Sequence, residues 1–287
     1  MTLDLKTQGI LLKITNVFLI SLISVLIKKF LPTVSIFQIL FITSLLSLAY
    51  LLLGCYRQLP KHIIPNSYHT ARSLSNMFAM LTWIYALKLI PVSLATSIGS
   101  LTPIATVVLA VYFLKDKLTP KKIIALSLGL LGMCIAIKPV FVDSPAGIIL
   151  ALASSLLWAI HDTITKKQTS TSSWVHISFY TYIITIPILA PFAFYYWKSP
   201  NFDEILYFVL ISSLMLLNKF LLISALAKTS ISLIAPISFS RFIFASFLAK
   251  ILLGEKTDSH LWYGTILVLC ATAFIFSTKD TTSYRSV

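Results

Sequence analysis

Acidic residues are scarce in this chain of 287 residues, in which 9 Asp and Glu stand against 23 Lys and Arg. Charged residues of both signs make up only 11% of the sequence, whereas soluble domains carry about 25%. Hydrophobic residues make up 57%, above the usual share of about 45–50%. The composition therefore excludes an ordinary soluble domain and indicates an integral membrane protein.

Cysteine is rare, and the common catalytic motifs are missing. The cysteines Cys55, Cys134 and Cys270 are odd in number and widely spaced, which argues against a disulfide framework and a cysteine-rich metal site. The sequence has no P-loop, HExxH or GxSxG motif, and no His, Cys, Asp and Glu residues at metal-ligand spacing. We therefore expect no metal, no cofactor and no enzymatic activity.

Long apolar stretches fill almost the whole chain. A helix needs about 20 apolar residues to cross the hydrocarbon core of a bilayer. The connections hold only a few residues each, so function must lie inside the helix bundle. We predict an all-α protein with ten transmembrane helices, at Gly9–Phe30, Ser35–Leu53, Thr70–Leu89, Val92–Leu114, Ile123–Ile137, Ala146–Lys166, Trp174–Tyr196, Glu204–Leu226, Ile231–Leu253 and Leu261–Ser277.

The net charge of +14 would suggest nucleic acid as a partner of a soluble protein, but here it is a signal of topology. With a cytoplasmic N-terminus, 13 Lys and Arg residues lie on the cytoplasmic side and 7 on the other. This bias predicts a multi-pass protein of the cell inner (cytoplasmic) membrane, monomer or homodimer, with both termini cytoplasmic. Its partners are the lipid bilayer and a small-molecule substrate, not nucleic acid. The 13 residues are Lys6, Lys13, Arg57, Lys61, Lys115, Lys117, Lys121, Lys122, Lys166, Lys167, Lys228, Lys279 and Arg285.

The second half of the chain repeats part of the first at a constant offset. The segment that begins at Ala86 (ALKLIPVSLATSIGSLTPIATVVLAVYFLKDK) aligns without a gap to the one that begins at Ala225 (ALAKTSISLIAPISFSRFIFASFLAKILLGEK). Both segments end in an acid followed by a lysine, Asp116–Lys117 and Glu255–Lys256. We predict two five-helix repeats, residues 1–140 and 141–287, within one membrane domain. Because five is odd, the second repeat enters the bilayer inverted, and the substrate site lies near the midplane between the halves.

These segments resemble the EamA-type branch of the drug/metabolite transporter superfamily. The motifs are WIYALKLIPVSLAT (Trp83–Thr96), YFLKDKLTPKKIIALSLGLLGM (Tyr112–Met133) and ILLGEK (Ile251–Lys256). A narrower similarity, to the S-adenosylmethionine uptake transporters of intracellular bacteria, includes HDTITKK (His161–Lys167) and YYWKSPNFDEILYFVLISS (Tyr195–Ser213). The resemblance implies a carrier that works by alternating access, with S-adenosylmethionine as the leading substrate. Alternatives are an exporter of amino acids or cationic drugs, and more remotely a lipid enzyme or a non-transporting scaffold.

Ionisable residues inside predicted spans are the best candidates for binding, since each costs about 2.5–3.5 kcal/mol near the bilayer centre. Arg241 lies near the middle of the ninth span and predicts a bidentate contact with a substrate carboxylate. The alternative is an arginine that only pins helix carbonyls. Ser238 and Phe239 are its neighbours, and the resemblance implies that this region lines the cavity.

Asp162 is the only acid well inside a span, and Trp158 lies one turn earlier on the same face. A carboxylate beneath an indole predicts a site for a positive group such as a sulfonium. The alternative is an ordinary helix salt bridge between Asp162 and Lys166, one turn later. His161 is either a proton shuttle or a satisfied interfacial histidine.

Further polar and kinked positions complete the predicted site. Arg72, Asn76 and Trp83 share one face of the third span and predict a vestibule, although Arg72 could instead snorkel to the headgroups. Pro103 and Pro236 each remove a helix hydrogen bond and predict kinks in the fourth and ninth spans. The remaining candidates are Lys219 in the eighth span, as a lower-priority cation, and Tyr85, as an aromatic lining residue.

Overall fold

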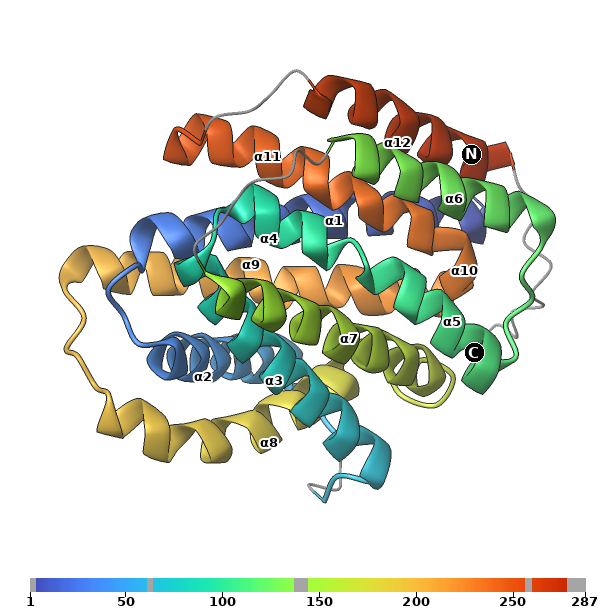
Figure 1. Ribbon diagram of the computed structural model, residues 1–287. Helices are drawn as coiled ribbons and strands as arrows, with labels where there is room; N and C mark the ends of the chain where they lie inside the picture. The colour runs from blue at the N-terminus through green and yellow to red at the C-terminus, as the bar shows by residue number, and fades with distance from the viewer. Residues whose placement is uncertain (1–3, 61–63, 137–143, 256–259, 278–287) are drawn as a thin grey trace.

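The computed structural model describes residues 4–60, 64–136, 144–255 and 260–277, and every regular element within these ranges is a helix (Figure 1). The predicted all-α fold is therefore confirmed. Ile137, the expected end of the fifth span, lies outside the described residues. So does Lys256, which the repeat aligns with Lys117. The elements are α1 (Leu5–Phe30), α2 (Ile36–Cys55), the 3-10 helix η1 (Tyr56–Gln58), α3 (Ser67–Leu89), α4 (Val92–Gly99), α5 (Thr102–Leu114), α6 (Pro120–Ala136), α7 (Pro145–Gln168), α8 (Trp174–Tyr195), α9 (Phe202–Lys228), α10 (Ile231–Ile234), the 3-10 helix η2 (Ala235–Phe239), α11 (Ser240–Leu253) and α12 (His260–Ser277).

Within the described ranges, seven helical stretches are long and apolar enough to cross a membrane. They comprise α1, α2 with η1, α4 with α5, α7, α8, α9, and α10 with α11. The helix α6 is not among them and has 17 residues, and α3 carries His69 and Arg72 in its first two turns. The number of ten spans, the inversion of the second repeat and the cytoplasmic location of the termini thus stay predictions.

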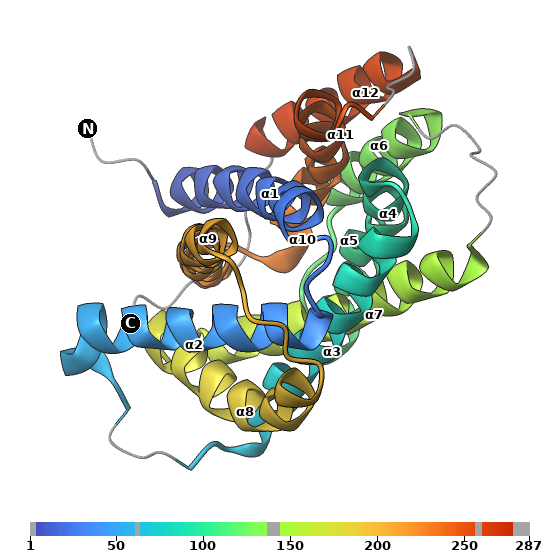
Figure 2. The same ribbon diagram turned by 90° about the vertical axis from the view of Figure 1, so that its left-hand side faces the viewer.

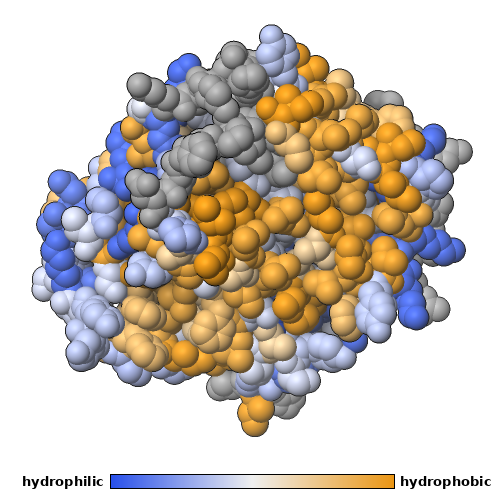
Figure 3. Space-filling view, viewed as in Figure 1, coloured by the Kyte–Doolittle hydropathy of each residue, from blue (hydrophilic) through white to orange (hydrophobic). Residues whose placement is uncertain are grey.

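The outer surface has the character expected of contact with lipid. In Figure 3, hydrophobic residues dominate the middle of the face shown, and hydrophilic residues gather toward its left and right edges. Exposed apolar side chains include Leu53 of α2, Val108 of α5, Ile149 of α7 and Phe194 of α8. Soluble monomers rarely expose contiguous apolar surface on this scale, so the band fits the hydrocarbon core of a bilayer.

The helices pack symmetrically: a contact between two helices has a counterpart between the corresponding helices of the other repeat (Figures 1 and 2). The contact between α1 and α9 corresponds to the contact between α7 and α3. The contact between α1 and α11 corresponds to the contact of α7 with α4 and α5. α2 packs on α9 as α8 packs on α3, while α2 pairs with α8 and α6 with α12 across the two repeats. This exchange is the packing expected of a fold built from two related halves.

The fourth and ninth predicted spans are both interrupted. α4 ends at Gly99 and α5 begins at Thr102, whereas η2 separates α10 from α11. Pro103 lies in the first turn of α5 and Pro236 in the first turn of η2, where a missing backbone N–H costs little. The breaks therefore lie where the two prolines predicted kinks.

Two lysines occupy equivalent places in the two repeats. Lys28 Nζ donates to the Ile90 carbonyl oxygen at 2.9 Å, just past the end of α3. Lys166 Nζ donates to the Thr229 carbonyl oxygen at 2.7 Å, just past the end of α9. Ile90 and Thr229 are aligned with each other in the sequence repeat. Each lysine satisfies a carbonyl at the C-terminal end of a helix, where positive charge is favoured.

Two acids cap helices of the opposite repeat. Glu255 Oε1 accepts from the Val92 amide at 3.1 Å, and Asp116 Oδ2 accepts from the Ser232 amide at 3.0 Å. Glu255 also pairs with Lys28 Nζ at 3.5 Å. Glu255 and Asp116 are likewise aligned in the sequence repeat, so the two acids stand in matching roles. We call Lys28, Ile90, Val92 and Glu255 the first end clamp, and Asp116, Lys166, Thr229 and Ser232 the second end clamp.

The two end clamps lie at opposite ends of the bundle. Arg72, near the start of α3, hydrogen-bonds Thr165 of α7, which directly precedes Lys166 of the second end clamp. Ile90 of the first end clamp follows the other end of α3. Since a helix rises about 1.5 Å per residue, the stretch of α3 from Arg72 to Ile90 separates the clamps by roughly 27 Å.

Candidate substrate-binding cavity

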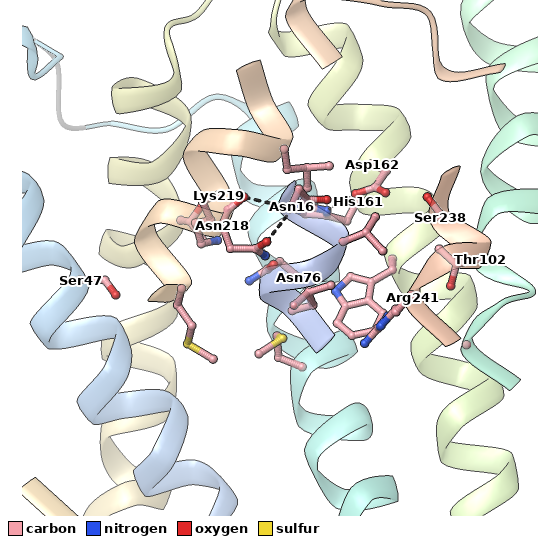
Figure 4. Close-up of a pocket in the computed structure, with 18 of the residues that line it drawn as sticks. Asn16, Ser47, Asn76, Thr102, His161, Asp162, Asn218, Lys219, Ser238 and Arg241 are labelled. Carbon is pink, nitrogen blue, oxygen red and sulfur yellow. Dashed lines mark hydrogen bonds and ion pairs between the residues drawn. The ribbon is translucent and has the colours of Figure 1, made fainter. Parts of the chain in front are cut away.

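A cavity of about 150 Å³ lies between the two repeats (Figure 4). Helices α1, α2, α3, α5, α7, α8, α9 and α11 and the 3-10 helix η2 contribute side chains to its wall. Hydroxyl, amide and charged groups gather there, in a part of the fold that is otherwise apolar. The polar lining residues are Lys13, Asn16, Thr43, Ser44, Ser47, Asn76, Thr102, His161, Asp162, Thr181, Tyr182, Thr185, Asn218, Lys219, Ser238 and Arg241.

Arg241, in the first turn of α11, extends over two tryptophan rings. Its Cζ lies 4.3 Å from the ring centroid of Trp83 on α3 and 4.8 Å from that of Trp158 on α7. The two indole centroids are 5.3 Å apart, and Trp83 Nε1 donates to Ser24 Oγ at 3.3 Å. Cation–π contacts of this kind stabilise a guanidinium away from water and fix its plane. The rings therefore hold the arginine head in one place at the cavity wall.

The hydrogen-bonding capacity of Arg241 is not used up by these contacts. Its Nε and Nη2 atoms are buried and have no hydrogen-bond partner within the described residues. A buried charged donor without an acceptor costs more than about 1–3 kcal/mol. A carboxylate accepts two parallel bonds from a guanidinium, so a ligand that brings one into the cavity removes this cost.

Asp162 and His161 form a pair on the α7 side of the cavity. His161 Nδ1 lies 2.9 Å from Asp162 Oδ1, and His161 is buried while Asp162 is partly exposed to the cavity. Lys166, the predicted alternative partner, donates to the carbonyls of Leu226 and Thr229 at 2.6 and 2.7 Å. Asp162 thus offers a carboxylate to a ligand, oriented by the imidazole next to it.

A polar network joins α1 to α9 on another side of the cavity. Lys13 Nζ donates to Asn16 Oδ1 at 3.3 Å, and Asn16 Nδ2 donates to Asn218 Oδ1 at 2.7 Å (Figure 4). Lys219 Nζ lies 5.4 Å from the ring centroid of Tyr182. Lys13 and Asn16 are not among the predicted site residues, and Lys13 was counted as a cytoplasmic charge. Lys13 and Asn16 share a helix face with Ile20, but only the structure shows that this face lines the cavity.

Arg72 lies neither in a vestibule nor at the lipid headgroups, the two positions predicted for it. Its side chain is 1% exposed, so it does not snorkel, and it is not part of the cavity wall. Its Nε donates to Thr165 Oγ1 at 2.8 Å, and its Nη1 donates to Thr181 Oγ1 at 2.6 Å and the Ile177 carbonyl at 3.1 Å. Arg72 therefore ties α3 to α7 and α8 from inside the protein.

The structure brings most of the other predicted residues to the cavity. Asn76, Pro103, Ser238 and Lys219 line it together with Arg241, Asp162, His161 and Trp158. Tyr85 does not, because it is 49% exposed and lines a separate pocket with Phe37 and Leu81. Phe239 is fully buried, with its ring against Gly129 of α6 and Val268 of α12. Pro236 is buried in η2 and is not part of the cavity wall.

The polar groups of the cavity wall are of kinds that bind a small charged ligand. No group of three His, Cys, Asp or Glu within the described residues could hold a metal ion. The wall offers an arginine, two lysines, one carboxylate, amides, hydroxyls and indoles, which together suit a small ligand that carries charge and a flat ring.

The chain is similar in sequence to several named transporters. The "S-adenosylmethionine uptake transporter" of Rickettsia felis (strain ATCC VR-1525 / URRWXCal2) is 30% identical over 219 residues, which is 76% of this chain and 74% of that protein. The protein of the same name from Rickettsia bellii (strain RML369-C) is 28% identical over 76% of this chain and 75% of its own length. A "Riboflavin transporter" of Vibrio cholerae serotype O1 (strain ATCC 39315 / El Tor Inaba N16961) is 20% identical over 77% of this chain and 75% of its own length.

The fold and the family agree as well. A solved crystal structure superposes with a TM-score of 0.78, at 15% identity over 94% of this chain and 96% of that chain. The model of the EamA-like transporter family matches twice, at residues 7–138 and 145–277. Since these matches cover most of the sequence, the chain belongs to the EamA-like transporter family.

Proposed function

We propose that this protein is a secondary carrier of a small polar or zwitterionic metabolite that bears a carboxylate, with uptake of S-adenosylmethionine as the leading candidate. One observation carries the proposal. Arg241 faces the cavity between Trp83 and Trp158, with two buried nitrogens that have no partner among the described residues. A substrate carboxylate supplies the acceptor that these nitrogens need.

The groups of S-adenosylmethionine find complementary residues in the cavity. Its carboxylate would bind Arg241, and its positive groups would bind Asp162 next to His161. Trp158 offers an aromatic face to the sulfonium or the adenine, and hydroxyls such as Thr43 and Ser47 suit the ribose. The names of the two Rickettsia relatives support the same substrate.

Riboflavin is a second candidate because relatives of that name also match. It has a flat ring for the tryptophans but no carboxylate for Arg241. An exporter of cationic drugs fits less well, since a cation without a carboxylate leaves the buried Nε and Nη2 atoms of Arg241 without an acceptor. A dependence of transport on Arg241 therefore separates the leading candidate from both.

The test is uptake of labelled S-adenosylmethionine and riboflavin into proteoliposomes that contain the full chain. Arg241→Ala should abolish uptake of S-adenosylmethionine, and Arg241→Lys should restore little, because a point charge cannot make the planar two-bond contact. Arg57→Ala, at an exposed arginine outside the cavity, is the matched control and should transport normally. Normal uptake by Arg241→Ala would refute the proposal, and uptake of riboflavin alone would favour the second candidate.

A further inference from the structure

The charges that line the cavity do not balance. Lys13, Lys219 and Arg241 contribute three positive charges, and Asp162 contributes one negative charge, which leaves an excess of two. Uncompensated charge inside the membrane is costly, and ionisable groups there normally pair with one another or face a ligand. A carboxylate alone at Arg241 would leave an excess of one, and a substrate that also carries positive groups, as S-adenosylmethionine does, would not reduce the excess, so the imbalance points to a second negative group.

Lys219 is the clearest unpaired cation of this set. Its ammonium contacts the face of Tyr182, at 5.4 Å from the centroid, and has no hydrogen bond or ion pair to any described residue. Figure 4 shows Lys219 and Arg241 on opposite sides of the cavity. The two cations are therefore separate sites and would not share one carboxylate.

The residues on the side of the cavity that holds Lys219 offer several hydrogen-bond donors. Asn16 uses its oxygen to accept from Lys13 and its nitrogen to donate to Asn218 Oδ1. Each of the two amide oxygens already accepts one bond, while the Asn218 amide nitrogen donates to no described residue and Lys13 and Lys219 hold further N–H groups. A corner that is rich in donors and positive charge selects an acceptor with negative charge.

We propose that Lys13, Asn16, Asn218 and Lys219 form a basic corner that binds a second anionic group, a phosphate or a carboxylate, of a ligand in the cavity. The inference rests on the proposed function only in that it treats the cavity as the binding site. S-adenosylmethionine has no second anionic group, so the basic corner assigns to this cavity a further class of ligand, one with two separated negative groups or a phosphate.

The experiment compares ligands that differ only in the second anionic group. Purified full-length protein in detergent is titrated with adenosine 5′-monophosphate against adenosine, and with succinate against butyrate, and affinities are taken from the shift of the unfolding midpoint. The first pair tests a phosphate and the second a carboxylate. The anionic member of at least one pair should bind about tenfold to a hundredfold more tightly, as expected for a charge-assisted contact.

Lys219→Met should remove this preference, so that the two members of each pair bind with similar affinity. Lys250→Met, at an exposed lysine of α11 outside the cavity, should keep it. Lys13→Met should also reduce the preference for the anionic ligands. If the Lys219 variant does not fold, the result for Lys13→Met tests the proposal in its place. Equal affinities within both pairs for the wild type, or a preference that survives both substitutions, would overturn the proposal.

The failure of this inference and that of the proposed function give different results. If Arg241→Ala transports S-adenosylmethionine normally while Lys219→Met still loses the preference, the basic corner stands and the assigned substrate fails. If Arg241→Ala abolishes transport while the paired ligands bind equally, the assigned substrate stands and the basic corner fails.

Discussion

Neutralising one end clamp should favour opening of the bundle at that end. In the first end clamp, Glu255 accepts from the Val92 amide at 3.1 Å and pairs with Lys28 at 3.5 Å. Glu255→Gln keeps an oxygen for the amide but loses the charge. The charge contributes about 0.3–1 kcal/mol through the α4 dipole and about 0.2–1 kcal/mol through the partly exposed ion pair. A loss of about 1 kcal/mol shifts a two-state equilibrium roughly fivefold.

The matched substitution is Asp116→Asn in the second end clamp. Asp116 caps the Ser232 amide at 3.0 Å, as Glu255 caps Val92, and its ion-pair partner is the buried Lys122, at 3.8 Å. Because the second clamp is at the other end of the bundle, this variant should favour opening there. Glu255→Ala also removes the cap hydrogen bond, which costs about 0.5–2 kcal/mol more, and should exceed Glu255→Gln.

The assay is the labelling rate of a cysteine placed in the cavity. Met80→Cys on α3 lines the cavity, and the native cysteines, two of which are exposed, would first be replaced by serine. A membrane-impermeant maleimide is applied to intact cells and to inverted vesicles. Glu255→Gln should raise the rate from one side about fivefold, and Asp116→Asn should raise it from the opposite side. Equal changes from one side in both variants, or none, would refute the assignment of the clamps to opposite gates.

Two further substitutions test the residues deeper in the bundle. Asp162→Asn should weaken transport of S-adenosylmethionine about tenfold to a hundredfold, since a charge-assisted contact is worth about 1.5–3 kcal/mol. Uptake of a neutral substrate should not change. Equal effects on both substrates would show that Asp162 has a structural role. Arg72→Met should lower the unfolding midpoint, because it removes three buried hydrogen bonds to Thr165, Thr181 and Ile177, without altering the substrate affinity of the folded fraction. Calorimetry and equilibrium binding measure both quantities, and a loss of affinity in folded protein would place Arg72 in the binding site instead.

The fold was predictable because its signals are local or regularly spaced. Apolar runs mark the helices, and the gapless match of the segments that begin at Ala86 and Ala225 marks the repeat. The same alignment relates Asp116 to Glu255, and both acids cap helices in equivalent places. The bonds themselves could not be predicted, because each acid caps a helix of the other repeat, and only the packing of the halves decides which amide it reaches.

Candidate residues were found where a charge stood out against its surroundings. Arg241 and Asp162 interrupt apolar helices, so their cost in the bilayer made them visible, and both line the cavity. Arg72 was equally visible, but burial against Thr165 and Thr181 gave it a structural partner that the sequence does not indicate. A charge inside a span thus predicts a partner, and the three-dimensional packing decides whether that partner is protein or ligand.

Lys13 shows the opposite case, a functional candidate with no local anomaly. It lies near the start of a span, where lysines ordinarily reach the headgroups, yet its side chain is 8% exposed and lines the cavity. What turns it inward is the packing of α1 on α9, fixed by the bond between Asn16 and Asn218, which are far apart in the sequence. Its inward position adds one positive charge to a cavity that already holds Arg241 and Lys219. The packing of two helices from different repeats therefore sets the charge that a ligand has to balance.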